Sequence, residues 1–323
     1  MNSKDFLSIL DISNGDVKSL VEKSARMKHD TNPKILKGKN IALLFEKPSL
    51  RTRVSFEVGI NQMGGNCIFL GGSEVGLGVR EPESDLAMVL DRWVDCIVAR
   101  VFSHNSLNLL ASNCSIPVVN ALSDRAHPCQ AVGDCLTIYE QKGRLEGLKL
   151  AFIGDGNNVA SSLALACSYA GMDFSIASPE SYQLPKDIWE SANKISDNKN
   201  TSLNWTPDPK EAVYDADIIY TDVWVSMGDE GEREERLAKF SEYQVNEELA
   251  SNAKPDFIFM HDMPAHEGEE ISKGMLDHPR SVVFDQAENR LHAQKAIHIK
   301  TVIGNTKRFL QKLYCTFMII QFG

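Results

Sequence analysis

The chain of 323 residues has no Cys-x-x-Cys pair, no long run of lysine and arginine, and no stretch near the ~20 apolar residues of a membrane span. Its seven cysteines are scattered, which is typical of free thiols in a reducing compartment and excludes a disulfide or zinc framework. The net charge of −10 does not favour binding to nucleic acid or acidic lipid, which are both negatively charged. The polar N-terminal segment lacks the features of a targeting peptide. We therefore expect a cytoplasmic protein without nucleic-acid or membrane partners, in which any basic site is local.

Hydrophobic residues make up 43% of the chain. A chain of 323 residues is too long for one compact core, and its length suits two α/β domains. Apolar runs of strand length alternate with segments of helical pattern. We expect strands at residues 41–45, 67–70, 96–101, 117–120, 148–153, 174–177, 218–221, 257–260 and 281–284. Such near-continuous apolar strands are typical of parallel sheets covered on both faces, and ligands gather at the carboxyl ends of their strands. The predicted fold class is α/β, with two domains that each hold a parallel sheet flanked by helices.

Residues 141–147 form a charged, glycine-punctuated segment between a predicted helix at 130–139 and the next strand. This composition predicts a domain junction. We expect a first domain at residues 1–140 and a second at 147–285.

The first candidate site follows the strand at 41–45, where hydroxyls and arginines open an amphipathic segment: Ser49, Leu50, Arg51, Thr52 and Arg53. A strand end at the start of a helix offers free backbone N–H groups, the positive end of a helix dipole and guanidinium forks. This arrangement predicts an anion site that suits phosphate best. The alternative is a capped helix start with two solvated arginines.

Two further strand ends carry Arg100 and the pair His127 and Gln130. Pro128 favours a helix start there, and one helical turn separates the imidazole from the amide. Both groups could donate to one carbonyl oxygen. Taken alone, His127 is equally compatible with a capping or packing role.

Gly154 and Gly156 follow the next strand and superficially match a dinucleotide-binding fingerprint. That interpretation requires an acidic residue at the end of the following strand, where the chain has Ala177, Ser178 and Pro179. The adjacent Asn157 and Asn158 instead supply amide donors that suit a carboxylate.

Asp222 follows the strand at 218–221 and could hold a substrate ammonium. A metal interpretation is open to four residues further along: His261, Asp262, His266 and Glu267. Pro264 disfavours it, because the two histidines cannot share a helix face as in a His-Glu-x-x-His site. Arg290, in the last predicted helix, either forms a solvated pair with Glu288 or is another arm of the anion site.

Residues 45–59, 127–130, 222–228 and 283–292 together resemble, in order, the signatures of the aspartate/ornithine transcarbamylase family, over about residues 5–297. The resemblance implies transfer of the carbamoyl group of carbamoyl phosphate to the side-chain amine of L-ornithine, giving L-citrulline and phosphate. It implies a carbamoyl-phosphate domain, an amino-acid domain, and a C-terminal helix at 286–311 that packs back on the first domain. It also implies homotrimers or multiples of trimers, with no metal or redox cofactor. The segment 312–323 has no assigned role.

The resemblance assigns residues to the two substrates. For carbamoyl phosphate they are Ser49, Leu50, Arg51, Thr52, Arg100, His127, Gln130 and Arg290. For ornithine they are Asn158, Asp222, Ser226, Met227, Asp262 and Met263. The expected catalytic residues are Arg51, Arg100, His127, Gln130 and Asp262. Asp222 is expected on the α-ammonium and Asn158 on the α-carboxylate, and a loop near residues 74–78 is expected to reach a neighbouring subunit's site.

Two departures from the family matter. The family's ornithine enzymes usually have Cys-Leu-Pro after the histidine at 261, whereas this chain has Asp262, Met263 and Pro264. An acid there favours a protonated amine, which cannot attack, unless Asp262 takes the proton as a general base or contacts a more cationic substrate. Leu50 replaces a common threonine, but backbone N–H groups can still bind phosphate.

Three alternatives stay open at this point. The acceptor could be another amine, such as putrescine, lysine or an acylated ornithine. The chain could be a catalytically silent paralogue that only binds ligand, although a silent binder does not need every group that polarises the carbonyl. The third alternative, an NAD-dependent dehydrogenase, lacks the ribose-binding acid.

Overall fold

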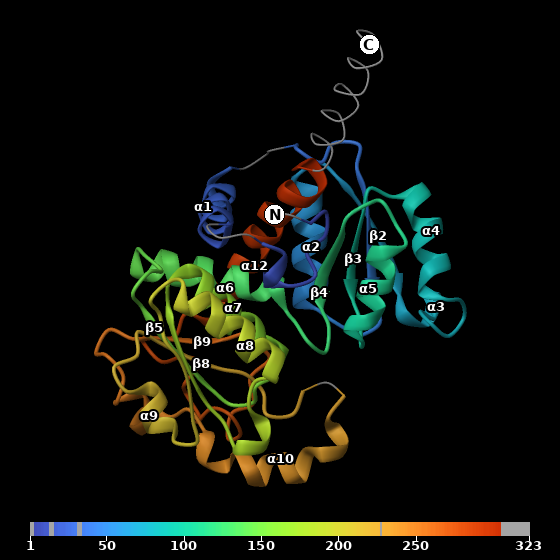
Figure 1. Ribbon diagram of the computed structural model, residues 1–323. Helices are drawn as coiled ribbons and strands as arrows, with labels where there is room; N and C mark the ends of the chain where they lie inside the picture. The colour runs from blue at the N-terminus through green and yellow to red at the C-terminus, as the bar shows by residue number, and fades with distance from the viewer. Residues whose placement is uncertain (1–2, 13–15, 31–33, 227, 305–323) are drawn as a thin grey trace.

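The computed structural model describes residues 3–12, 16–30, 34–226 and 228–304. Two all-parallel sheets lie in separate lobes, and helices flank each sheet (Figure 1). The predicted fold class is confirmed. Among the described residues, no helix combines the length and hydropathy that crossing a membrane requires. Residues 305–323, which include the predicted segment 312–323, lie outside the described residues.

The first sheet has the strand order β2-β1-β3-β4. Its strands are β1 (Asn40–Phe45), β2 (Asn66–Gly71), β3 (Cys96–Arg100) and β4 (Val118–Leu122). Its helices are α2 (Arg51–Gln62), α3 (Gly72–Val75), α4 (Glu83–Trp93) and α5 (His104–Ser112). Successive side chains of β1 enter apolar clusters on opposite faces of the sheet, since Leu43 joins one cluster and Leu44 the other. Burial on both faces explains why β1 is apolar along almost its whole length.

The second sheet has the order β7-β6-β5-β8-β9. Its strands are β5 (Lys149–Ile153), β6 (Asp173–Ala177), β7 (Leu203–Thr206), β8 (Ile218–Thr221) and β9 (Ile258–His261). Its helices are α7 (Asn158–Ala170), α8 (Lys186–Asp197), α9 (Pro209–Val213), α10 (Arg233–Phe240) and α11 (Glu247–Ala250). The strand order reverses between β5 and β8, and in the first sheet between β1 and β3. These reversals open crevices at the carboxyl ends of the strands, where ligands bind in open α/β sheets.

Three helices join the two lobes: α1 (Asp16–His29), α6 (Pro128–Lys142) and α12 (Val283–His298). The C-terminal helix α12 returns to the first lobe and packs on α1, α2 and α6, as the resemblance implied. Two glycines allow its close approach: a Cβ at Gly59 would meet Leu291 Cδ1 at 3.2 Å, and one at Gly133 would meet Arg290 Cα at 3.4 Å. One apolar cluster runs through both lobes and α12, so the lobes share a core.

Several expected elements differ from the observed ones. The predicted strand at 281–284 is wrong, because Ser281 forms only an isolated bridge with Phe259 and Val283 already begins α12. The edge strand β7 has no counterpart among the predicted strands. The helix expected at 130–139 extends to Lys142 and ends at Gly143, whose φ of 74° suits a helix C-terminus. The exact domain boundaries stay a prediction.

Candidate active site

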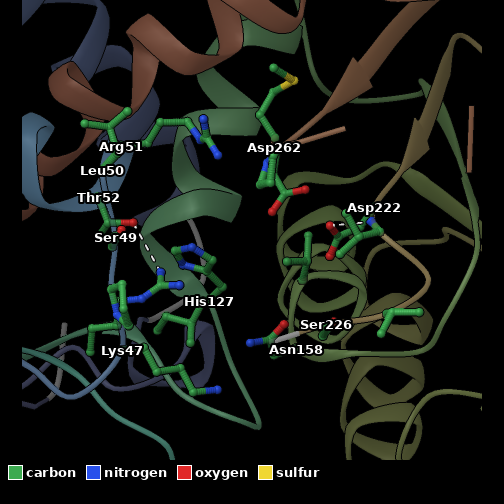
Figure 2. Close-up of a pocket in the computed structure, with 18 of the residues that line it drawn as sticks. Lys47, Ser49, Leu50, Arg51, Thr52, His127, Asn158, Asp222, Ser226 and Asp262 are labelled. Atoms are coloured by element: carbon green, nitrogen blue, oxygen red, sulfur yellow. Dashed lines mark hydrogen bonds between the residues drawn. The ribbon is translucent and has the colours of Figure 1, made fainter. Parts of the chain in front are cut away.

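A cavity of about 470 Å³ lies at the carboxyl ends of both sheets, between the lobes (Figure 2). Most of the predicted site residues line it: Ser49, Leu50, Arg51, Thr52, Arg100, His127, Asn158, Asp222, Ser226, Asp262, Met263 and Arg290. Gln130 is buried and is not one of the lining residues, and Met227 lies outside the described residues. The sequence analysis missed Lys47 and Glu230 and considered His266 only as a metal ligand, and all three line the cavity.

Cationic side chains gather at one end of the cavity around the hydroxyl of Thr52. Arg290 Nη2 donates to Thr52 Oγ1 at 2.6 Å, and Arg100 Nη1 lies 3.4 Å from the same oxygen. The Nε atoms of Arg100 and Arg290 are buried and have no hydrogen-bond partner among the described residues. Burial and the neighbouring Arg290 lower the pKa of Arg100 to about 10. Crowded, buried guanidinium groups with unused donors form a site that favours an anion.

The start of α2 lies at this same end. Its N-cap residue is Leu50, whose side chain can accept no hydrogen bond, so the N-cap side chain leaves the N–H groups of the first turn uncapped. Arg51 lines the cavity, whereas Arg53 pairs with Glu57 and lies 3.5 Å over the ring of Phe69. The observed helix start therefore argues against the alternative of a capped helix with two solvated arginines and favours an anion site.

His127 occupies the N-cap position of α6, and its backbone N–H donates to Ser162 Oγ at 2.8 Å. The ring is buried, and Nδ1 has no hydrogen-bond partner in the described part of the chain. Burial, together with Arg290 and Arg100, lowers the pKa of His127 well below its ordinary value. The imidazole is therefore neutral at physiological pH, with one N–H that can donate to a ligand.

Gln130 has a different hydrogen-bonding role from the one the sequence suggested. Its Nε2 donates to Asp134 Oδ1 at 2.8 Å, while Oε1 is buried and has no partner within the described residues. Gln130 therefore has a free hydrogen-bond acceptor, Oε1, where the sequence analysis expected a free donor. A carbonyl oxygen of this kind suits an N–H donor of a ligand.

Asp134 is the centre of a buried network between the lobes. Its Oδ1 also accepts from Gln286 Nε2 at 2.8 Å, and its Oδ2 accepts from Tyr220 Oη at 3.2 Å. Burial raises the pKa of Asp134 to about 7, although these three donors oppose the shift. Gln286 Oε1 in turn accepts from the backbone N–H of His261 at 2.9 Å. The network thus ties α6 and α12 to β8 and β9.

Asp222 and Asn157 are joined at the other end of the cavity. Asn157 Oδ1 caps α7 by accepting from the N–H groups of Val159 and Ala160, and its Nδ2 donates to Asp222 Oδ2 at 2.8 Å. Asp222 Oδ1 accepts from Val223 N at 2.7 Å. These bonds stabilise the carboxylate form of Asp222, which suits a ligand cation.

Asn158 is the other half of the predicted pair of amide donors. It lines the cavity, and its Nδ2 donates to Ser123 O at 2.6 Å. An amide NH₂ group has two hydrogens, so this bond leaves one for a ligand. The two asparagines therefore differ in role: Asn157 holds Asp222, and Asn158 faces the cavity.

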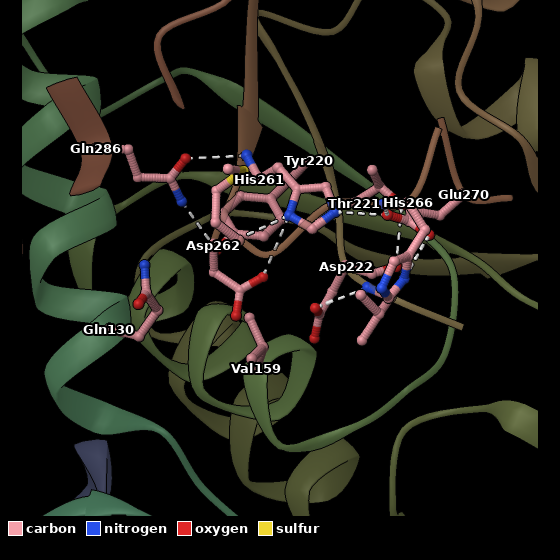
Figure 3. Close-up of polar contacts among 12 residues, drawn as sticks. Gln130, Val159, Tyr220, Thr221, Asp222, His261, Asp262, His266, Glu270 and Gln286 are labelled. Carbon is pink, nitrogen blue, oxygen red and sulfur yellow. Dashed lines mark hydrogen bonds and ion pairs between the residues drawn. The ribbon is translucent and has the colours of Figure 1, made fainter. Parts of the chain in front are cut away.

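His261 orients the segment that carries Asp262 (Figure 3). Its Nδ1 accepts from Met263 N at 2.9 Å, so the ring proton is on Nε2, which lies 3.1 Å from Glu270 Oε1. The Asp262 side chain is 13% exposed, and its Oδ1 is buried with no hydrogen bond to any described residue. Burial and the nearby Asp222 carboxylate raise the pKa of Asp262 well above its usual value.

Among the described residues, two clusters could be considered for a metal ion. Asp222, His261 and Asp262 have potential ligand atoms within 4.8 Å of one another, but hydrogen bonds engage both ring nitrogens of His261. In the second cluster Glu270 accepts from the His266 backbone, and Glu269 pairs with Arg233. A metal at either place would have to break these bonds, so neither donor set fits one.

Comparisons with known proteins agree with this arrangement. Residues 4–140 match the family "Aspartate/ornithine carbamoyltransferase, carbamoyl-P binding domain", and residues 146–301 match "Aspartate/ornithine carbamoyltransferase, Asp/Orn binding domain". Both family domains are present in this order, and together they cover most of the chain. The chain therefore belongs to the aspartate/ornithine carbamoyltransferase family.

Similar proteins within that family are ornithine carbamoyltransferases. The one from Bacillus subtilis is 49% identical over 294 residues, which cover 91% of this chain and 92% of that protein. The one from Thermococcus kodakarensis is 47% identical over 309 residues, or 94% and 98% of the two chains. The solved ornithine carbamoyltransferase from Pyrococcus furiosus has a TM-score of 0.90 at 44% identity, and the match covers 93% of this chain and 97% of that one. These similarities confirm the resemblance.

Proposed function

We propose that this chain transfers the carbamoyl group of carbamoyl phosphate to the side-chain amine of L-ornithine, giving L-citrulline and phosphate. One observation carries the proposal: a single cavity has clustered arginines at one end and the carboxyls of Asp222 and Asp262 at the other (Figure 2). Carbamoyl phosphate is an anion, and ornithine brings ammonium groups, so the two charges match the two ends. The similar ornithine carbamoyltransferases support this assignment.

The arginine end is assigned to carbamoyl phosphate. Ser49, Leu50, Arg51 and Thr52 present hydroxyls, a guanidinium and N–H groups at the start of α2 to the phosphate. Three further residues surround the carbamoyl group: Arg100, His127 and Gln130. Arg290 reaches the same place from α12 and is held there by Thr52. The carbamoyl NH₂ group suits the unpartnered Oε1 of Gln130.

The acidic end is assigned to ornithine. Asp222 accepts the α-ammonium, and the remaining amide hydrogen of Asn158 faces the α-carboxylate. Four more residues belong to this end: Ser226, Met227, Asp262 and Met263. The side-chain amine then points from this end toward the carbamoyl carbon.

The reaction needs a neutral amine to attack the carbonyl carbon. Negative charge then develops on the carbonyl oxygen, where donors from Arg51, Thr52 and the neutral His127 stabilise it while the bond to phosphate breaks. Both reactants are held in one cavity, so positioning supplies a further part of the rate enhancement. Arg100 and Arg290, both within hydrogen-bond reach of Thr52, add positive charge beside the carbamoyl group.

We also place the enzyme in the cytoplasm and assign it a homotrimer or a multiple of trimers. Scattered cysteines support the location. Exposed apolar side chains of the first lobe support the assembly, among them Leu50 at 73%, Val79 at 91% and Trp93 at 70% exposure. The segment 74–78 precedes Val79, and we assign it to a neighbouring subunit's cavity. Light scattering of the purified protein is expected to give the molar mass of a trimer or of a multiple of trimers.

The function is tested by incubating the purified protein with carbamoyl phosphate and, separately, ornithine, putrescine, lysine and N-acetylornithine. The ureido product is measured in each reaction. Ornithine turnover far above that of the other amines is expected. Turnover with a different amine alone, or with none of them, would overturn the proposal.

A further inference from the structure

The two carboxyls at the acidic end of the cavity differ in their hydrogen bonds. Asp222 accepts from Val223 N at 2.7 Å and from Asn157 Nδ2 at 2.8 Å. Asp262 Oδ1, by contrast, is buried with no hydrogen-bond partner in the described residues, although it faces the same cavity. Donors stabilise a carboxylate, and Asp262 Oδ1 lacks the donors that Asp222 has.

Charged and titratable groups face Asp262 from every element around it. They are Asp134 on α6, Arg290 on α12, Arg100 on β3, Tyr220 on β8, Asp222 after β8 and His261 on β9. Burial, first of all, and the Asp222 carboxylate favour the neutral acid, while Arg290 opposes them, and the net effect is a raised pKa of Asp262. His261 Nδ1 accepts from Met263 N and lies 3.6 Å from Asp262 Oδ1, so it offers this oxygen no proton.

This environment changes the effect that an acid has on an amine. In water a carboxyl beside an alkylamine gives a carboxylate and an ammonium, and the ammonium cannot attack. In a buried site that lacks donors for the carboxylate, the neutral pair of acid and amine is favoured instead. The surroundings of Asp262 thus convert an incoming ammonium into a nucleophile.

We propose that Asp262 is the proton acceptor for the attacking amine, and this inference rests on the proposed carbamoyl transfer. Substrate binding places the α-ammonium on Asp222 and the side-chain ammonium against Asp262, which loses its own proton to solvent as the ammonium arrives. One N–H proton moves to the Asp262 carboxylate, and the freed lone pair forms the C–N bond. The C–O bond to phosphate breaks, and the second N–H proton leaves on phosphate as the hydrogen phosphate dianion. The proton taken from the amine leaves Asp262 as the neutral acid with which the cycle began.

The test compares pH profiles of kcat and kcat/KM for ornithine in the parent enzyme, Asp262→Asn and Asp262→Cys. Asparagine keeps the shape but cannot take the proton, so kcat at neutral pH is expected to fall about 100-fold or more. The rate of this variant should then rise with pH, because hydroxide and solvent supply the free amine. The KM for carbamoyl phosphate should not change. In Asp262→Cys, kcat should recover in part, with the acidic limb of the profile at a different pH from that of the parent.

Asp222→Asn is the matched contrast, since it removes a charge from the other carboxyl of the same pair. It should raise the KM for ornithine and move the acidic limb of kcat to lower pH, because the Asp222 carboxylate helps to raise the pKa of Asp262. Asp262→Asn with the parent kcat and pH profile would overturn the proposal, and so would Asp262→Cys with an unmoved limb. Parent enzyme that forms no citrulline would instead overturn the proposed function. A thermal-shift assay checks that each variant is folded, because carbamoyl phosphate stabilises only the folded state. If Asp262→Asn does not fold, the pH profile of Asp262→Cys alone tests the proton-acceptor role.

Discussion

Arg290 donates a hydrogen bond of 2.6 Å to Thr52, although the two residues lie 238 positions apart in the chain. Thr52 is in the first turn of α2, and Arg290 lies on α12, the helix that returns to the first lobe. The bond therefore connects the packing of the last helix to the anion site. Arg100 reaches the same hydroxyl, so one oxygen orients two guanidinium groups.

The first prediction concerns this hydroxyl. Thr52→Val keeps the shape and leaves Arg290 without its acceptor, which costs about 1–3 kcal/mol, or roughly 5- to 150-fold in affinity. The KM for carbamoyl phosphate should rise within this range, with little change in the KM for ornithine. Thr301→Val is the control, because it removes a buried hydroxyl that bonds only Ile297 O among the described residues. Equal KM values in Thr52→Val and the parent would contradict the assignment.

The second prediction separates two arginines of α2. Arg51 lines the cavity, whereas Arg53 pairs with Glu57 at 2.8 Å. Stabilisation by carbamoyl phosphate follows from binding to the folded state, so Arg51→Gln should lose most of the thermal shift and Arg53→Gln should keep it. Similar losses in both variants would show that the charge of α2, and not the position of Arg51, determines binding.

The third prediction is a pH dependence of stability from Asp134. Its pKa rises from 3.8 to about 7 in the folded protein, so between these values the unfolded chain binds fewer protons than the folded one. The stability that this group contributes is therefore present below pH 4 and is lost as the pH rises to about 7. The variant Asp134→Asn has no titrating carboxyl at this position. The urea concentration at its unfolding midpoint, minus that of the parent, should therefore increase from pH 4 to 7 and then level off. A difference that does not vary with pH would contradict the raised pKa.

The fourth prediction concerns the protonation of His127. Its pKa is well below the ordinary value, so the ring should show no titration between pH 5.5 and 8 in NMR spectra of histidine-labelled protein. His127→Asn should lower kcat about 100- to 1000-fold, as loss of an oxyanion donor does in other enzymes. A titration midpoint near 6.5 assigned to His127 would show that an imidazolium, and not a neutral ring, faces the carbamoyl oxygen.

The sequence predicted those parts of the site that directly follow apolar strands. Arg100 and Asp222 come at or just after strand ends, and parallel strands bring such ends to one edge of a sheet. The strand β7 escaped prediction because it is a short edge strand with an exposed Asn204 in place of a continuous apolar run. The segment at 281–284 was assigned the wrong structure because Val282 and Val283 are buried by the packing of α12, which a local pattern does not reveal.

The network around Asp134 could not be predicted in the same way. Its contact with Gln130 is local, four positions along one helix, and this spacing was available in the sequence. Tyr220 and Gln286 lie 86 and 152 positions away and meet Asp134 only after the lobes and α12 have packed together. The acceptor role of Gln130 follows from that packing, so the sequence alone left the amide's direction undetermined.

The most direct test of the central claim is a crystal structure with carbamoyl phosphate and L-norvaline, which is ornithine without its terminal amine and cannot react. The account predicts the phosphate at Arg51 and the start of α2, and the α-ammonium on the carboxylate of Asp222. The end of the norvaline side chain should point toward the carbamoyl carbon and Asp262. Phosphate bound away from Arg51, or an amino acid bound with its ammonium away from Asp222, would contradict the account.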